Sequence, residues 1–368
     1  MNERWSNIKK IDFTLLTVVL LICIFGLIAI SSATQNLVNP ERYIQTQLYA
    51  TIAGFVAIVI LLFIDYKTFG ELYLFIYVFS CMLLIAVLYA GVGADDWGAS
   101  RWLYIGPFGF QPSDFAKLGI IIALAKVISE HRETINELKT LTKIVIMAGI
   151  PMALVYRQPD LGTSLVIPVF TLAMLYVAGL RYRYIVILIM GAISSIPLIW
   201  PRLADYQKRR ILVFLDPELD PMGDGWQITQ SIYAVGSGML HGKGLREGIQ
   251  SQFGFLPEKH TDFIFAVIAE ELGFVGVAIL LFLYSLLLVK GIHIAKKQKD
   301  YFGSYLAIGI ISMLGFHIFA NIMMTIGLMP VTGKPLPFVS YGGTFMLSNL
   351  IAIGLLINIS MRRKKPKY

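Results

Sequence analysis

The chain has 368 residues, of which 57% are hydrophobic and 15% charged, and its mean hydropathy is +0.70. This composition excludes an ordinary soluble domain. The formal net charge is +8, but the basic residues gather between apolar runs. The charge is therefore a signal of membrane orientation, and no nucleic-acid partner is expected.

Ten apolar runs recur along the chain, and most are long enough to cross ~30 Å of hydrocarbon as helices. They are expected at Phe13–Ser32, Tyr43–Ile64, Leu72–Val92, Phe115–Ser129, Ile144–Tyr156, Leu161–Gly179, Tyr184–Trp200, Phe263–Val289, Tyr305–Ile326 and Val339–Met361. The runs are continuously apolar and do not alternate, which excludes a transmembrane β-barrel. The sequence predicts an all-α polytopic membrane protein with one membrane domain over residues 1–368. Cys23 and Cys81 fall inside predicted spans, so neither a disulfide framework nor a metal site is expected.

The basic residues also predict the orientation. Nineteen of the 31 lie on the side that holds both termini, against four in the short loops opposite (Arg42, Arg101, Arg157 and Lys334). Both termini are therefore expected in the cytoplasm, with Pro201–Thr261 as a long extracellular loop. A loop of this length should contain short helices, and Trp226–Val235 is typical of an amphipathic one.

The polar residues are concentrated on the outer side, above all where that loop enters the eighth span. Four charged or titratable side chains occupy five positions there: Glu258, Lys259, His260 and Asp262. Thr261 is expected to cap the following helix, which would place Asp262 in its first turn. Asp262 is then either a base at the membrane surface or a helix-start carboxylate.

The first outer loop carries Arg101 and Trp102 and leads into the fourth span. Ser113 is expected to cap that helix, with Asp114 in the first turn and Lys117 at i+3, where the two can pair. Lys117 is either a lysine whose ammonium reaches the interface or a buried cation awaiting an anionic substrate.

Three more outer segments have two readings each. Asp160, between two spans, either caps the next helix or serves a site. The glycine-rich stretch 236–248, which carries Lys243, is a mobile loop or one whose amides approach a phosphate. Prolines exclude ordinary helix from Met329–Pro337, so Ser340, Gly342 and Gly343 line a cavity, pack helices closely, or both.

Together these segments resemble the SEDS family (shape, elongation, division, sporulation) of polytopic bacterial membrane proteins. The matching motifs, in family order, are Arg101-Trp102 with Gln111-Pro112-Ser113, Gln158-Pro159-Asp160-Leu161-Gly162-Thr163, Phe214-Leu215-Asp216-Pro217, Gly236-Ser237-Gly238, Leu256-Pro257-Glu258 with His260-Thr261-Asp262-Phe263, Glu270-Glu271-Leu272-Gly273, and Pro337-Phe338-Val339-Ser340-Tyr341-Gly342-Gly343. Gln250-Ser251-Gln252 and the segment Pro330–Pro337 resemble the rod-shape RodA branch more than the division FtsW branch.

The resemblance implies a peptidoglycan glycosyltransferase that polymerises lipid II, a disaccharide-peptide on undecaprenyl pyrophosphate, outside the cytoplasmic membrane for cell elongation and rod shape. Asp262 matches the family's essential loop aspartate and is the expected general base. A pyrophosphate leaving group needs cations and no proton, so one base is enough. Cations are expected from Lys117, Arg101, Arg210 and Lys243, and further substrate contacts from Trp102, Asp160, Glu258, His260, Ser340, Gly342 and Gly343. The sequence fixes no cofactor and no set of metal ligands, although a divalent cation could share the diphosphate.

The resemblance also implies partners, namely a class B penicillin-binding protein that crosslinks the strands and other membrane proteins of the elongation complex. The outward loops contain no evident Ser-x-x-Lys pattern, so crosslinking must come from elsewhere. Two other functions stay open. A lipid II flippase would need polar residues through the full membrane depth, and a non-catalytic scaffold would leave Asp262 dispensable.

Overall fold

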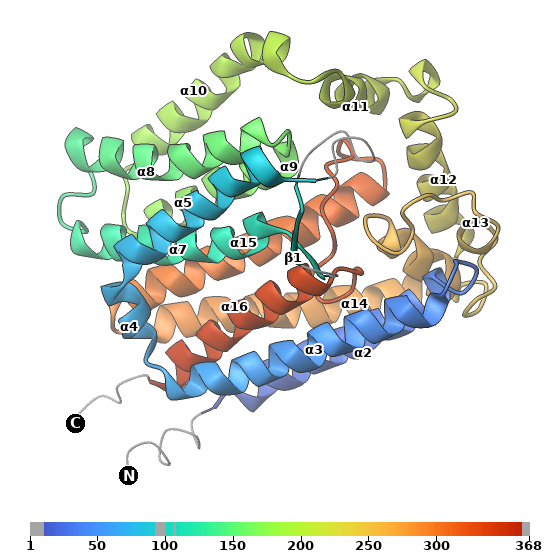
Figure 1. The fold of residues 1–368 in the computed structure, drawn as a ribbon, viewed down its shortest axis with the longest axis horizontal. Coiled ribbons are helices and arrows are strands. Elements are labelled where there is room, and N and C mark those ends of the chain that lie inside the picture. Colours follow the sequence, from blue (N-terminus) through green and yellow to red (C-terminus); the bar gives the residue numbers. More distant parts are fainter. Residues whose placement is uncertain (1–10, 93–100, 106–107, 363–368) are drawn as a thin grey trace.

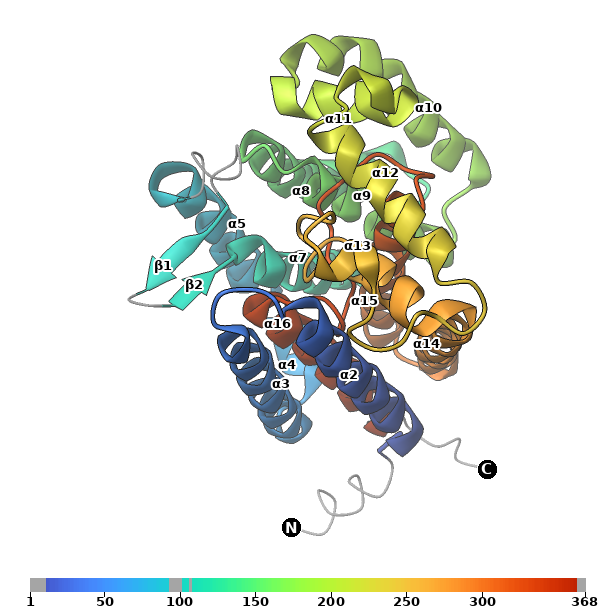
Figure 2. The ribbon, with the colours of Figure 1, turned by 90° about the vertical axis from the view of Figure 1, so that its right-hand side faces the viewer.

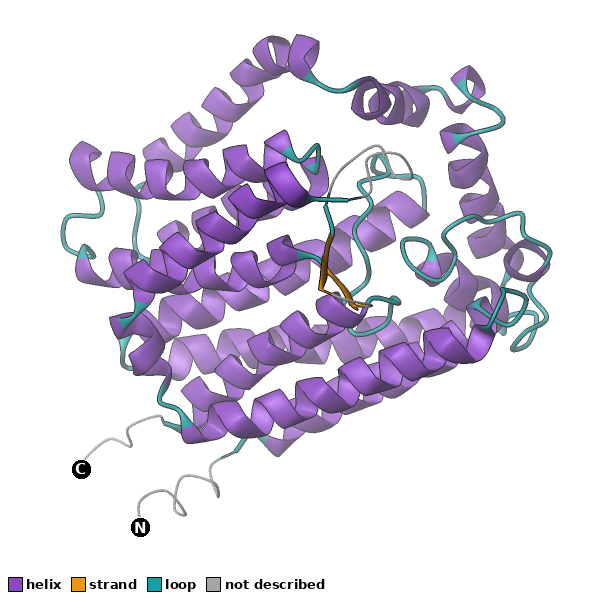
Figure 3. Cartoon of the chain, viewed as in Figure 1, coloured by secondary structure: helices purple, strands orange, loops and turns teal. Residues whose placement is uncertain are grey.

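The computed structural model describes residues 11–92, 101–105 and 108–362, and these are mostly helical (Figure 3). Its elements are α2 (Phe13–Ala33), α3 (Pro40–Phe63), α4 (Tyr66–Glu71), α5 (Tyr73–Ala90), β1 (Leu103–Ile105), β2 (Phe108–Phe110), α7 (Pro112–Glu130), α8 (Leu138–Arg157), α9 (Leu161–Val177), α10 (Tyr182–Ile199), η1 (Trp200–Arg202), α11 (Asp205–Leu215), η2 (Pro217–Leu219), α12 (Asp224–Ser237), α13 (Ile249–Gln252), α14 (Ile264–Lys297), α15 (Tyr301–Thr325) and α16 (Gly343–Met361). The two strands pair antiparallel.

Ten of the described helices have at least 17 residues, and they match the ten expected spans one for one. Eight are long and apolar enough to cross a membrane. The others are α7, which carries several charged residues, and α9, which has 17 residues. The largest boundary differences are at the start of α8 and the end of α14. Hydropathy detects only the apolar part of a helix, and both helices continue into sequence rich in lysine.

The helices form a bundle with α15 and α16 at its centre (Figures 1 and 2). In the most apolar window of α16, 78% of the residues are buried, against none in α10. α10 leads away from the bundle to α11 and α12, which arch over one end. α3 and α16 approach closely because Gly54 lies against Leu350, and Gly354 against Ile58. The start of α2 and the end of α16 lie at the same end, as expected for ten spans.

The segment between α15 and α16 is irregular and runs into the interior (Figure 1). Lys334, Leu336, Phe338 and Ser340 are each at most 3% exposed. Non-helical backbone at membrane depth is tolerated when protein surrounds it. Burial in protein is therefore what accommodates this proline-rich segment.

α14 is broken at Gly273, whose φ of 63° is not helical. The loop before α13 repairs the break through four hydrogen bonds of 2.9–3.1 Å: Lys243 N to Glu270 O, Gly244 N to Glu271 O, Phe274 N to Met239 O and Val275 N to Leu240 O. Gly238 and Gly242 permit this approach, because a Cβ at either would lie about 2 Å from a helix carbonyl oxygen. These glycines thus bring the loop against a helix. The amides of Lys243 and Gly244 are therefore bonded to helix carbonyls and are not available to a phosphate.

Candidate active site

Five segments converge on Asp262, which is half-buried and lies two residues before α14. Its charged neighbours come from other segments: Arg101 before β1, Asp160 between α8 and α9, Arg210 on α11 and Lys334 between α15 and α16. Gly333 lies between Asp262 and Arg210. A Cβ there would be 3.4 Å from Asp262 Oδ2 and 3.7 Å from Arg210 Nη1. With φ of 62°, this position also favours glycine on backbone grounds.

The backbone around Asp262 is fixed by buried hydrogen bonds. Asn321 of α15 donates through Nδ2 to the carbonyls of Asp262 (2.8 Å) and Lys334 (2.7 Å). Ser340 Oγ donates to Thr261 O at 2.6 Å and accepts from Leu336 N at 2.7 Å. Asp262 and Lys334 are therefore held to the same side chain, and Ser340 has a positioning role.

The expected helix start at Thr261 is wrong. α14 begins at Ile264, and Thr261 Oγ1 donates to the Glu258 carboxylate at 2.9 Å. Asp262 consequently precedes the first helical turn. Because it lies outside the helix, its carboxylate does not cap α14 and is available for other contacts.

The Asp262 carboxylate accepts no hydrogen bond and forms no salt bridge with any residue that the structure describes. Burial raises the pKa of Asp262 above its ordinary value, while Arg210, Lys334 and Arg101 act against that rise. An unpaired carboxylate with a raised pKa is suited to accept a proton.

Asp160 differs from Asp262, although both are acidic residues that precede helices. It caps α9 as expected, accepting from Thr163 N at 3.0 Å, and it also binds Lys334 Nζ at 2.9 Å. Burial alone would raise the pKa of Asp160, but Lys334 and Arg101 hold it well below its usual range. Lys334 was not singled out from the sequence. The available signal was one lysine between a glycine and a proline in an otherwise apolar segment.

Arg101 and Arg210 are the cations best placed to receive an anion beside Asp262. Arg101 donates to Pro159 O at 2.9 Å, and the Arg210 guanidinium lies 5.5 Å from the Tyr206 ring centre. In the described part of the chain, neither forms a salt bridge with a carboxylate. Guanidinium groups bind phosphate oxygens bidentately. The site thus contains three cations, Arg101, Arg210 and Lys334. Its two carboxylates are Asp160 and Asp262, so one positive charge is in excess.

Lys117 and Lys243, the other predicted cations, already have acidic partners. Lys117 is buried and lies 3.1 Å from Asp114 Oδ1 and 3.2 Å from His317 Nε2. Lys243 lies 2.9 Å from the fully buried Glu270. The expected Asp114–Lys117 pair is confirmed, but the cap at Ser113 is wrong because α7 begins at Pro112.

The remaining predicted residues lie around the group or apart from it. His260 packs against the rings of Tyr43 and Tyr341, and burial together with Lys259 lowers its pKa to about 4. Glu258 is linked to the Asp262 backbone through Thr261. The others have backbone or packing contacts: Trp102 pairs with Val92, Gly342 N donates to Gln47, and Gly343 faces α3.

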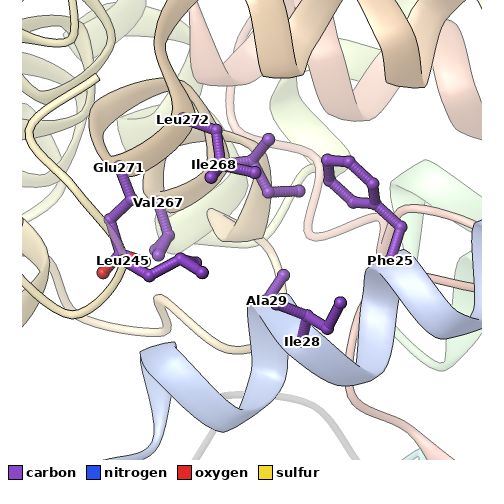
Figure 4. A pocket seen from close by; sticks show the side chains of 8 residues that line it. All are labelled: Phe25, Ile28, Ala29, Leu245, Val267, Ile268, Glu271 and Leu272. Atoms are coloured by element: carbon purple, nitrogen blue, oxygen red, sulfur yellow. The ribbon is translucent and has the colours of Figure 1, made fainter. Parts of the chain in front are cut away.

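An apolar pocket of about 150 Å³ lies between α2 and the first part of α14 (Figure 4). Its lining comprises Phe25, Ile28, Ala29, Leu245, Val267, Ile268, Glu271 and Leu272. Because nearly all of this lining is hydrocarbon, the pocket can accept part of a lipid chain but no charged group.

Within the described ranges, no group of three or more His, Cys, Asp or Glu side chains is arranged to hold a metal ion. The divalent cation foreseen from the sequence therefore has no ready set of protein ligands among these residues.

Comparison with known proteins identifies the family. The family model described as "cell cycle protein", which covers FtsW, RodA and SpoVE, matches residues 12–365. The peptidoglycan glycosyltransferase MrdB of Escherichia coli K12 is 39% identical over 98% of this chain and 96% of its own length. A solved peptidoglycan synthase complex, described as coordinating polymerization and crosslinking, contains a chain with a TM-score of 0.83 and 31% identity, over 95% of this chain and 97% of that one. Thermus thermophilus RodA matches with a TM-score of 0.73 and 29% identity, over 97% and 98%. The chain therefore belongs to the SEDS family of FtsW, RodA and SpoVE, and it is a multi-pass protein of the cytoplasmic membrane.

Proposed function

We propose that the chain is a peptidoglycan glycosyltransferase that polymerises lipid II at the outer face of the cytoplasmic membrane, in the elongation branch of its family. Relatives named for this activity match nearly the whole chain. The observation that carries the mechanism is the Asp262 carboxylate, which lies beside two guanidiniums; among the described residues it is unpaired and they have no acidic partner.

In this mechanism, Asp262 accepts the proton of the acceptor sugar hydroxyl as that oxygen attacks the anomeric carbon of the donor. The bond from this carbon to the diphosphate oxygen breaks, and undecaprenyl pyrophosphate leaves with the bonding electrons. Arg210 and Arg101 stabilise the negative charge that grows on the diphosphate. Unlike a glycosidase, the enzyme needs no second carboxyl group to protonate an alcohol leaving group.

The contacts also divide the predicted cations by role. Arg101 and Arg210 bind the diphosphate, whereas Lys334 acts mainly through Asp160, which it holds ionised. Lys117 stabilises α7 through Asp114, and Lys243 joins the loop before α13 to Glu270 of α14, because each lysine is already neutralised by a carboxylate. The apolar pocket beside α2 offers space for part of the prenyl chain.

A class B penicillin-binding protein is the proposed partner, with other membrane proteins of the elongation complex around the pair. A relative with the same fold was solved in a complex that couples polymerization to crosslinking. The partner would add the crosslinking activity that the sequence of this chain gives no sign of.

The test is polymerisation of purified lipid II by the purified protein in detergent, with and without the purified partner, read as glycan chains on a gel. Glycan chains that form when this protein is present, and do not form when it is left out, support the proposal. A protein that moves lipid II across vesicle membranes but makes no glycan under either condition is a flippase. Glycan that forms only when the partner is present, and in an amount that Asp262→Asn leaves unchanged, identifies a scaffold. A chelator arm tests whether a divalent cation shares the diphosphate.

A further inference from the structure

A second pocket, which unlike the first is lined by several charged side chains, lies at the opposite end of α14 from Asp262. It has a volume of about 500 Å³ and lies where the start of α2, the end of α14 and the end of α16 meet. Its principal lining side chains are Asp12, Phe13, Lys290, His293, Lys297 and Ser360. None of these residues belongs to the proposed glycosyltransferase site.

The pocket carries an excess of basic groups. Lys290, His293 and Lys297 are spaced i, i+3 and i+7, so they share one face of α14. Among the described lining residues Asp12 is the one acidic side chain, and it lies 3.7 Å from Lys290 Nζ while also capping α2 through Leu15 N at 3.1 Å. Among the described residues, Lys297 forms no salt bridge. Two lysines against one carboxylate, which is itself shared with a helix cap, leave room for a further anion.

The surroundings indicate an anion that belongs to a lipid. Phe13 lines the pocket and is 61% exposed, while Val289 and Ile292 of α14 are exposed beside the basic face. The basic asymmetry of the sequence places this end on the cytoplasmic side, and inner leaflets contain anionic lipids. A dissolved phosphate would use the lysines but not the exposed hydrocarbon beside them.

We propose that this pocket binds the phosphate group of an anionic phospholipid from the inner leaflet. Lys290 and Lys297 contact the phosphate oxygens, and the acyl chains lie along Phe13 and the exposed face of α14. Asp12 weakens this binding because it competes with the phosphate for Lys290.

The first test titrates phosphatidylglycerol into the purified, detergent-solubilised protein and counts bound lipid by native mass spectrometry, with phosphatidylcholine and inorganic phosphate as separate probes. Phosphatidylglycerol should bind more tightly than either. The Lys290→Gln/Lys297→Gln protein should lose about 10- to 30-fold in its affinity for phosphatidylglycerol, as expected from two lysines near an anionic surface. The matched control, Lys296→Gln/Lys299→Gln, removes the same charge from exposed lysines that do not line the pocket and should keep the wild-type affinity.

The second test is a gain of binding. Asp12→Asn keeps an oxygen that can cap α2 but removes the competing charge, so its phosphatidylglycerol affinity should rise several-fold. Thermal melting of each variant in the same detergent checks folding. Equal losses in the two double variants would overturn the proposal, since binding would then reflect diffuse charge. So would weaker binding by Asp12→Asn, or inorganic phosphate binding as tightly as phosphatidylglycerol.

Discussion

Asp262 and the pair of glutamates that begins eight positions later, Glu270 and Glu271, have opposite environments. Asp262 is half-buried, and its carboxylate has no hydrogen-bond partner in the described part of the chain. Glu270 is fully buried and accepts from Lys243 Nζ, Gln250 N and Ser251 N, each at 2.9 Å. The neighbouring Glu271 accepts from Ser32 and Gln252 at 2.6–2.9 Å.

This difference indicates that Asp262 is available to react, whereas Glu270 and Glu271 stabilise the fold. Ionised groups buried in protein are stable only when they are paired and hydrogen-bonded, as Glu270 and Glu271 are. Glu270 and Glu271, together with the loop before α13, join α13 and α2 to the broken helix α14. Asp262 faces cations without a direct bond to any of them, so it can exchange a proton without loss of structure.

Apart from Asp262 itself, the largest expected effect comes from the cations beside its carboxylate. Arg210→Gln should lower the turnover of lipid II polymerisation by about 10²-fold, the usual consequence of removing one preorganised electrostatic contact. Steady-state kinetics should show the loss mainly in kcat, because the charge on the diphosphate grows in the transition state. Arg209→Gln is the matched control, since the Arg209 side chain is 63% exposed. This substitution should lower turnover less than threefold. Equal effects of the two changes would contradict the role given to Arg210.

The second prediction concerns the paired side of the comparison. Glu270→Gln leaves Lys243 without its acidic partner and weakens the acceptor of two backbone amides. Breaking such a pair should reduce the free energy of unfolding by about 3 kcal/mol. Thermal melting in detergent should show a lower Tm, with turnover per folded molecule nearly unchanged. A normal Tm with lost turnover would instead place Glu270 in the chemistry.

The smallest effect is a shift in pH dependence. Asp262 acts in its deprotonated form, so kcat/KM should fall as the pH drops through its pKa, which burial raises above the ordinary aspartate value. Arg210 opposes that rise. The acid limb of the Arg210→Gln pH profile should therefore move to higher pH, while that of Arg209→Gln stays in place. A shift to lower pH would contradict the proximity of Arg210 and Asp262.

Much of the fold could be predicted because continuous hydropathy is a local property. The break at Gly273 could not, since the apolar run continues through it and the compensating hydrogen bonds come from residues 239–244. The start of α14 was misplaced for a related reason. Thr261 has the residue type of a cap, but its hydroxyl donates a hydrogen bond to the Glu258 carboxylate instead.

Most members of the site could be predicted from the sequence, but one member, Lys334, and the pairings between residues could not. Asp262, Arg101, Arg210 and Asp160 were each singled out from the sequence, and the structure brings them together. Lys334 was counted only as a basic residue, because its partner Asp160 is 174 positions away. Likewise, no local sequence pattern indicates that Lys243 forms a salt bridge with Glu270. Ion pairs between residues far apart in the sequence therefore determine which cations are left to bind a substrate.

The most direct test of the account is the turnover of Asp262→Asn, measured on purified, monodisperse protein with purified lipid II. Asn has nearly the same shape but cannot take the proton of the acceptor hydroxyl. Turnover should therefore fall at least ~10²-fold, while the Tm and lipid II binding stay near wild type because the carboxylate is bonded to none of the residues that the structure describes. Turnover within about threefold of wild type would contradict the assignment of Asp262 as the general base.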